Sequence, residues 1–255
     1  MEDLFGEALG IGSPWYISDV SFDGDSKRLD IHLDFKRGSK FELDGEMCGV
    51  HDTVHKEWRH LNFFEHECYL HARVPRVKHS DGRVKLILPP WAGKLDGFTL
   101  LFEAMCMELC KHMPVSAVGR LTNISDYKLW RMMDVYIMQA RSQEDYSEVD
   151  TIGMDETSVA KHHHYITLFV DLEHKRTLFA TPGKGAETVK AFAEELEQHE
   201  AHAGQVTQVS CDMSPAFIKG VQTHVPNAAI TFDKFHIMKI INEAVDQVRR
   251  EEAKT

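Results

Sequence analysis

The stretch that decides the fold is Val206-Thr207-Gln208-Val209-Ser210-Cys211-Asp212-Met213-Ser214-Pro215, a short β-branched run that stops at an aspartate. An earlier run has the same design, Val149-Asp150-Thr151-Ile152-Gly153-Met154-Asp155-Glu156. Two carboxylates at the ends of neighbouring strands form a hard-oxygen site suited to Mg²⁺ or Mn²⁺. Asp155 and Asp212 are therefore predicted to be the catalytic, metal-binding residues of an enzyme of phosphodiester chemistry, provided that the two strands lie side by side.

The elements around these runs predict an α/β fold. We expect strands at 151–155, 164–171, 176–181, 206–211 and 228–232, and helices at 186–199, 215–224 and 236–250. Three strands followed by alternating helices and strands is the order of an RNase H-like fold, in which the first and fourth strands are adjacent. That adjacency would hold the carboxylates of Asp155 and Asp212 about 4–6 Å apart, close enough to share one ion. The alternative is that both aspartates only form turns or cap helices.

Three neighbouring features have weaker interpretations. Asp233 is either a third carboxylate, with His236 as a proton carrier or phosphate contact, or the N-cap of the last helix, and the cap is favoured. Glu156 should point away from Asp155 if the strand continues. The run His162–His164 is interpreted as a surface or strand-edge cluster.

The first 92 residues read as a β-rich module. Alternating runs predict strands at 15–20, 29–35, 67–74 and 83–88, and Pro89-Pro90-Trp91 ends the module because proline cannot continue a ladder. Cys48, His51 and His79 are candidate zinc ligands. A closed zinc site needs four ligands, and the module has no Cys-x-x-Cys pair, so a zinc site and a degraded one both stay open.

A helix-turn-helix is predicted next. Apolar positions at helical spacing over 99–112 are followed by a short helix at 114–121, a turn at Thr122-Asn123 and a second helix from Ser125. Such a second helix can enter the major groove of DNA, whereas the alternative is an ordinary helical hairpin in a core. If this segment binds DNA, we expect the cationic side chains of Arg120, Lys128 and Arg131 to face the duplex. The apolar side chains of Leu121, Leu129 and Met132 should then be buried.

Composition allows a soluble protein with one large or two ordinary domains. Apolar residues make up 43% and charged residues 27% of the 255, and no apolar run approaches the roughly 20 residues of a membrane helix. The five scattered cysteines suggest a reducing, cytoplasmic setting. The net charge of −11 argues mildly against nucleic-acid binding, yet basic residues gather between Arg73 and Arg131, so a local basic module can still bind DNA.

Together these motifs resemble the ISL-three-like insertion-sequence transposases, a bacterial family of DDE-type DNA-moving enzymes. The similarity runs through almost the whole chain and is carried by Gly153-Met154-Asp155-Glu156-Thr157-Ser158, Asp212-Met213-Ser214-Pro215-Ala216-Phe217, Phe232-Asp233-Lys234-Phe235-His236 and the segments 50–53, 58–64, 72–77 and 97–104.

The resemblance implies three successive parts: a zinc-finger-like module (1–92), a helix-turn-helix segment that reads terminal inverted repeats (93–141) and an RNase H-like catalytic domain (149–255). It maps the first two catalytic acids onto Asp155 and Asp212 and implies Mg²⁺ or Mn²⁺ as cofactor. It further implies a homo-oligomer on DNA in the bacterial cytoplasm, associated with the nucleoid.

The sequence departs from the family pattern in two places. The Cys-x-x-Cys expected just before Cys48 is absent, and His79 stands where a later cysteine is expected, so zinc binding is in question. The family's catalytic glutamate falls beyond Thr255, so we expect a truncated transposase that binds DNA without cleaving it. The alternative function is an inactive DNA-binding remnant or a regulator of transposition.

Overall fold

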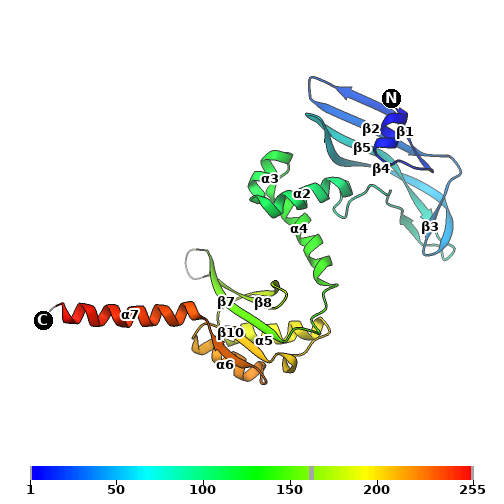
Figure 1. Cartoon of the computed structure of the whole chain (residues 1–255). Coiled ribbons are helices and arrows are strands. Elements are labelled where there is room, and N and C mark those ends of the chain that lie inside the picture. Colours follow the sequence, from blue (N-terminus) through cyan, green and yellow to red (C-terminus); the bar gives the residue numbers. More distant parts are fainter. Residues whose placement is uncertain (1, 161–163, 254–255) are drawn as a thin grey trace. The chain divides into compact units, whose positions relative to one another are not determined.

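The computed structural model describes residues 2–160 and 164–253, which form two compact units, Met1–Gln139 and Ala140–Thr255 (Figure 1). The boundary falls near the end of helix α4 (Asp126–Arg141). The finer division of the first unit at residue 92 stays a prediction. No helix of the described ranges is long and apolar enough to cross a membrane.

A six-stranded sheet makes up most of the first unit. Its order is β1-β2-β5-β4-β3, with β6 on β5, and a short helix α1 (Glu2–Ala8) packs beside β1. The strands are β1 (Trp15–Asp23), β2 (Arg28–Phe35), β3 (Lys40–Leu43), β4 (Glu46–Phe63), β5 (His66–Lys78) and β6 (Val84–Leu86).

Two strands of this sheet, β3 and β4, were not among those predicted. β4 runs for 18 residues, but few of its side chains are buried and its apolar residues do not alternate. It is a strand because it pairs with β5 along almost its whole length, from Val50 opposite Val77 to Phe63 opposite His66. Tertiary pairing rather than local pattern sets its conformation.

Three helices complete the first unit: α2 (Leu100–His112), α3 (Val115–Thr122) and α4. Thr99 caps α2 by accepting a hydrogen bond from the Phe102 amide. The helices share a small apolar cluster of their own, built around Phe102, Cys106, Val118, Leu129 and Met132. These residues recur every three or four positions, which is why the sequence pattern predicted the helices correctly.

The second unit contains a five-stranded sheet of order β11-β10-β7-β8-β9. β10 pairs in parallel with both β7 and β11, whereas β7, β8 and β9 form an antiparallel meander. The predicted adjacency of the first and fourth strands is thus confirmed. The strands are β7 (Thr151–Ala160), β8 (His164–Asp171), β9 (Arg176–Pro182), β10 (Gln208–Cys211) and β11 (Ala229–Phe232).

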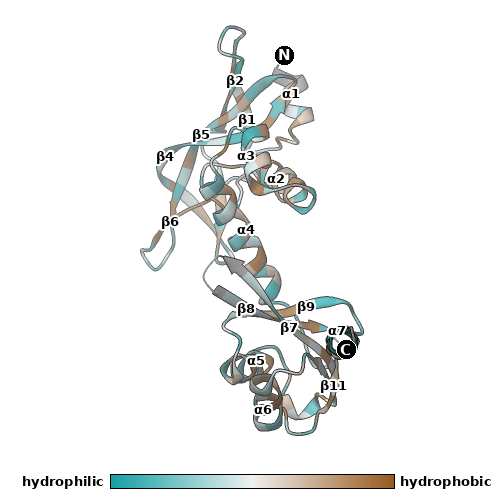
Figure 2. Cartoon of the chain, turned by 90° about the vertical axis from the view of Figure 1, so that its left-hand side faces the viewer, coloured by the Kyte–Doolittle hydropathy of each residue, from teal (hydrophilic) through white to brown (hydrophobic). Residues whose placement is uncertain are grey.

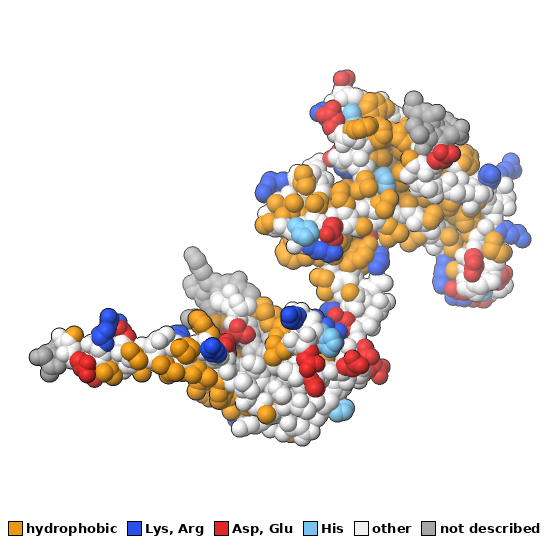
Figure 3. Space-filling view, viewed as in Figure 1, with side chains coloured by type: hydrophobic (Ala, Val, Ile, Leu, Met, Phe, Trp, Pro, Cys, Tyr) orange, Lys and Arg blue, Asp and Glu red, His pale blue; other side chains and the backbone are white. Residues whose placement is uncertain are grey.

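Helices α5 (Ala186–Gln198) and α6 (Pro215–His224) pack side by side on one face of this sheet (Figure 2), and a 3-10 turn (Ala203–Gln205) leads into β10. Their apolar side chains form the core of the unit with Ile152, Met154, Phe169, Val209 and Cys211. Helix α7 (Lys234–Glu252) has no buried residue, and hydrophobic side chains along it face solvent (Figure 3).

Among the element boundaries that differ from the predictions, two lie at the candidate site. β7 continues five residues past Asp155, because its antiparallel ladder with β8 runs on to Ala160 opposite His164. Helix α7 begins at Lys234 rather than 236, because Asp233 supplies its cap. His162 and His163 of the predicted histidine cluster lie outside the described residues.

Candidate active site and nucleic-acid interface

Asp155 and Asp212 stand level on two neighbouring parallel strands. β10 pairs with β7 so that Val209 lies opposite Ile152 and Ser210 opposite Gly153. Continuing this register by two residues places Asp212 opposite Asp155. Neighbouring strands are about 4.8 Å apart and residues at one level project from the same face, so the two carboxylates emerge together.

Both aspartates line one pocket of 230 Å³ on the sheet face opposite α5 and α6. Gly153 forms part of its wall, and a side chain there would come within 2.9 Å of Val170 and Leu172. The close approach of β8 therefore requires glycine at this position. The full lining is Gly153, Met154, Asp155, Leu168, Val170, Ser210, Cys211, Asp212 and Asp233.

Backbone amides hold one oxygen of each aspartate. Oδ1 of Asp155 accepts from the Glu156 amide at 2.8 Å, and Oδ1 of Asp212 accepts from the Ser214 amide at 2.9 Å. The turn role that was the alternative for Asp212 is thus present, but the same side chain also lines the pocket. Turn formation and a site role are compatible because they can use different oxygens of the carboxylate.

Asp233 is the N-cap of α7, and its role as a third carboxylate stays a prediction. Its Oδ1 accepts from the Phe235 amide at 2.9 Å, which confirms the predicted N-cap of α7, and the side chain also lines the pocket. Nδ1 of His236 lies 3.4 Å from the other oxygen of Asp233. The parallel pairing of β10 with β11 explains this position, because Cys211 lies opposite Phe232 and both strands end in aspartate.

Glu156 belongs to the electrostatics of the site although it does not line the pocket. Burial, followed by the negative charge of Asp212, raises the pKa of Glu156, while Lys184 opposes the rise. The side chain is half-buried, so the surface position expected for it is only partly correct. Sequence alternation gave its direction but not its proximity to Asp212.

The pocket does not hold a finished three-ligand site. Across residues 2–160 and 164–253, no three His, Cys, Asp or Glu side chains converge closely enough to bind a metal ion. The expected 4–6 Å separation of the Asp155 and Asp212 carboxylates stays a prediction. The donors themselves suit a divalent cation, because paired carboxylates with water are the ligands that Mg²⁺ prefers.

The helix-turn-helix consists of α3, a tight turn and α4. Asn123 ends α3 in the left-handed conformation (φ 57°), and the chain then starts α4 at Asp126. The three candidate DNA contacts, Arg120, Lys128 and Arg131, are all exposed. Leu129 and Met132 are buried as predicted, each 1% exposed.

Leu121 was predicted to be buried, and this is wrong, because 64% of it is exposed. The buried stripe of α3 runs through Val118, Gly119 and Thr122. At 3.6 residues a turn, Leu121 lies about 100° round the helix from the middle of that stripe. The packing of α3 against α2 and α4 therefore buries a different face of α3 from the one that the sequence predicted.

Family models match three successive parts of the chain. These are a zinc-finger of transposases IS204/IS1001/IS1096/IS1165 over 46–81, a helix-turn-helix domain of transposase family ISL3 over 87–137 and the ISL3 family's DDE-type transposase domain over 152–255. The chain belongs to the ISL3 family of transposases.

Two curated relatives of this ISL3-family chain are also transposases. The transposase for insertion sequence IS1001 of Bordetella parapertussis is 30% identical over 97% of this chain and 62% of its own length. The transposase for IS1557 of Mycobacterium tuberculosis is 27% identical over 97% of this chain and 57% of its own. The chain thus spans about three fifths of the length of these relatives.

The zinc-finger segment of this ISL3 chain lacks a zinc donor set. Cys48 is 3% exposed within the apolar core of the first unit, and burial together with Glu46 and Asp44 raises its pKa, which disfavours the thiolate that zinc needs. His51 is exposed on β4. Within residues 2–160 and 164–253 no three potential ligands lie close enough to hold a metal ion, and zinc binding by Cys48, His51 and His79 stays a prediction that the burial of Cys48 disfavours.

Ion pairs join the two turns of this segment instead. His79 lies 3.3 Å from Glu46 and 3.1 Å from Asp81. Across the turns, Asp44 pairs with Arg83 at 3.3 Å and with Lys85 at 3.4 Å. Charged side chains at these positions hold the β3–β4 turn beside the β5–β6 turn. The residues present do not fit zinc, because no thiolate faces the turns.

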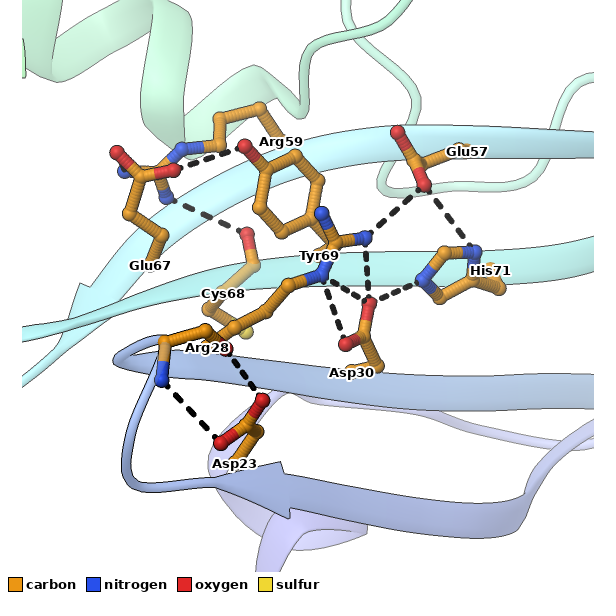
Figure 4. Close-up of polar contacts among 10 residues, drawn as sticks. Asp23, Arg28, Asp30, Glu57, Arg59, Glu67, Cys68, Tyr69 and His71 are labelled. Carbon is orange, nitrogen blue, oxygen red and sulfur yellow. Dashed lines mark hydrogen bonds and ion pairs between the residues drawn. The ribbon is translucent and has the colours of Figure 1, made fainter. Parts of the chain in front are cut away.

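Sequence reasoning missed a polar network on the sheet of the first unit (Figure 4), which also contacts the helix-turn-helix. Glu67 accepts from the Tyr69 hydroxyl at 2.9 Å and from Asn123 in the turn of the motif at 3.0 Å. Buried Arg59 donates to two backbone carbonyls, and its guanidinium lies 5.1 Å from the ring of Phe102 in α2. The two contacts that reach the helices, Glu67 with Asn123 and Arg59 with Phe102, join residues more than 40 positions apart and leave no local signal in the sequence.

A buried carboxylate reinforces this junction. Glu103 is fully buried and accepts from the amides of Lys94 and Leu95 at 2.9 and 2.7 Å, and from the Tyr136 hydroxyl at 2.6 Å. These bonds tie α2 to the preceding loop and to α4. The recognition helix is therefore held by specific polar contacts in addition to its apolar stripe.

Proposed function

We propose that this ISL3-family chain serves in transposition of a bacterial insertion sequence: it binds the terminal inverted repeats through the helix-turn-helix and carries the first two acids of a DDE centre. The observation that supports the centre best is the pair Asp155 and Asp212, level on adjacent parallel strands and lining one pocket. The proposed fold of the second unit is RNase H-like, which the strand order β11-β10-β7-β8-β9 supports.

Mg²⁺ or Mn²⁺ bound by Asp155 and Asp212 would make an attacking water or hydroxyl more acidic and offset charge on the phosphate. The chain's own part is to fix these two carboxylates through hydrogen bonds from backbone amides, with Asp155 inside β7 and Asp212 directly after β10. Lys184, whose charge reaches Glu156, offers a cation for the DNA backbone near the acids.

A second candidate function follows from the number of donors. The described part of the chain holds no converging group of three metal ligands. A chain with two acids could occupy transposon ends without cutting them, as an inactive DNA-binding remnant or a regulator. On either function we expect homo-oligomers on DNA and a cytoplasmic, nucleoid-associated protein.

Direct measurement of Mn²⁺ binding tests the centre. Calorimetric titration of the full chain should show weak Mn²⁺ binding that Asp155→Asn and Asp212→Asn each remove, with circular dichroism unchanged. Asp150→Asn, on the exposed start of the same strand, is the matched control and should bind as the parent does. Equal Mn²⁺ binding by all four proteins would contradict the assignment of these two residues.

A further inference from the structure

Two large aromatic side chains lie on the solvent side of α4. Tyr127 is 69% and Trp130 57% exposed, and because they are three positions apart on one helix they form a contiguous aromatic patch. Both sit in the first half of the helix that follows the tight turn of the motif. In a helix-turn-helix that half reaches the base edges.

The helical repeat shows which charged residues share a face of α4 with Tyr127 and Trp130. At 100° per residue, Tyr127, Trp130, Arg131 and Asp134 fall on one face, opposite the buried Leu129 and Met132. The Arg131 guanidinium lies 5.9 Å from the Tyr127 ring, which places these two side chains together. Lys128 lies on the flank instead, with its ammonium 5.7 Å from the ring of Phe98.

The chemistry of the central face suits bases better than phosphates. Aromatic and apolar side chains contact the thymine methyl, arginine pairs with the acceptors of guanine, and a carboxylate accepts from the amino group of cytosine. Asp134 in the middle of the face would repel a phosphate. The flanking cations Arg120 and Lys128 are placed for the phosphate backbone, which carries no sequence information.

Resting on the proposed DNA-binding function, we propose that Tyr127, Trp130, Arg131 and Asp134 are the base-reading face of this protein, and that Arg120 and Lys128 only bind phosphate. The occupant of the exposed apolar surface is duplex DNA. Arg131 beside Tyr127, with the exposed Lys128 and Arg120 in the same motif, complements a polyanion, and these cations are the argument for DNA as the occupant.

The test separates specific from general affinity. A duplex is selected from a random pool with the full chain, and fluorescence anisotropy then compares it with a scrambled duplex of equal composition at several salt concentrations. Trp130→Ala and Tyr127→Ala should each weaken binding to the selected duplex about 5- to 100-fold and leave the scrambled duplex and the salt slope unchanged. Lys128→Ala should weaken both duplexes and reduce the salt slope by about one unit.

Leu101→Ala is the matched control, because Leu101 is also 57% exposed but lies on α2, and it should change neither affinity. The proposal is overturned if both aromatic variants keep the parent's ratio of selected to scrambled affinity, or if they lose both affinities equally with a lower salt slope. Loss of self-association with DNA binding intact would assign the face to a second copy instead. Failure of the parent chain to bind any duplex would overturn the proposed function as well.

Discussion

His60 should make the first unit sensitive to mild acid. The ring is 8% exposed at the junction of β4 and α2, where its Nδ1 lies 2.9 Å from the Thr99 hydroxyl that caps α2. Burial, followed by the charge of Arg59, lowers the pKa of His60 to about 4. The Thr99 hydroxyl can donate to Nδ1 only while the imidazole is neutral, which is the form that burial favours.

The sign of the effect follows from the lowered pKa. The unfolded chain protonates this histidine near pH 6.5 and the folded chain only near pH 4, so stability falls as the pH drops through that window and levels off below it. The full effect is on the order of 3 kcal/mol, of which about 2 kcal/mol is lost by pH 5. Acid should therefore loosen the cap of α2 and the helix-turn-helix with it.

Urea unfolding at pH 7.5 and pH 5 measures this loss. His60→Asn keeps an acceptor for the Thr99 hydroxyl but cannot titrate, so the variant should lose about 2 kcal/mol less than the parent between the two pH values. His51→Asn, at an exposed position on the same strand, should retain the parent's dependence. Parallel losses in the parent and His60→Asn would refute the reasoning.

Three further outcomes are expected. Because only Asp155 and Asp212 are proposed as metal ligands, the 255-residue chain should bind DNA without cleaving transposon ends in Mg²⁺ or Mn²⁺. A polypeptide of its relatives' full length should cleave, and Asp155→Ala should abolish that cleavage. Efficient cleavage by the 255-residue chain would contradict this and would make Asp233, which also lines the pocket, a candidate third ligand. Glu103→Gln should lower the unfolding free energy by about 2–4 kcal/mol in urea titrations, because its three donors lose a charged acceptor; an unchanged midpoint would contradict this. The purified chain should contain no stoichiometric zinc by elemental analysis, and EDTA should leave its Tm unchanged; a drop in Tm would show that the turns bind metal.

Local chemistry determined much of this protein from the sequence. A β-branched run followed by aspartate and a turn predicts a strand end, which is why Asp212 and the cap at Asp233 were placed correctly, whereas β7 continues past Asp155. Helical periodicity likewise identified the buried Leu129 and Met132 of α4. Each of these features depends on neighbours within a few residues.

Tertiary pairing decided the rest. Only the parallel register of β10 with β7 brings Asp212 level with Asp155, and that contact joins residues far apart in the chain. Packing of α3 against α2 and α4 leaves Leu121 exposed. Cys48 is buried in the core of the first sheet and does not face the β3–β4 and β5–β6 turns. A periodic pattern defines the faces of an element, but which face is covered depends on the partner that packs against it, and a single sequence does not encode that choice locally.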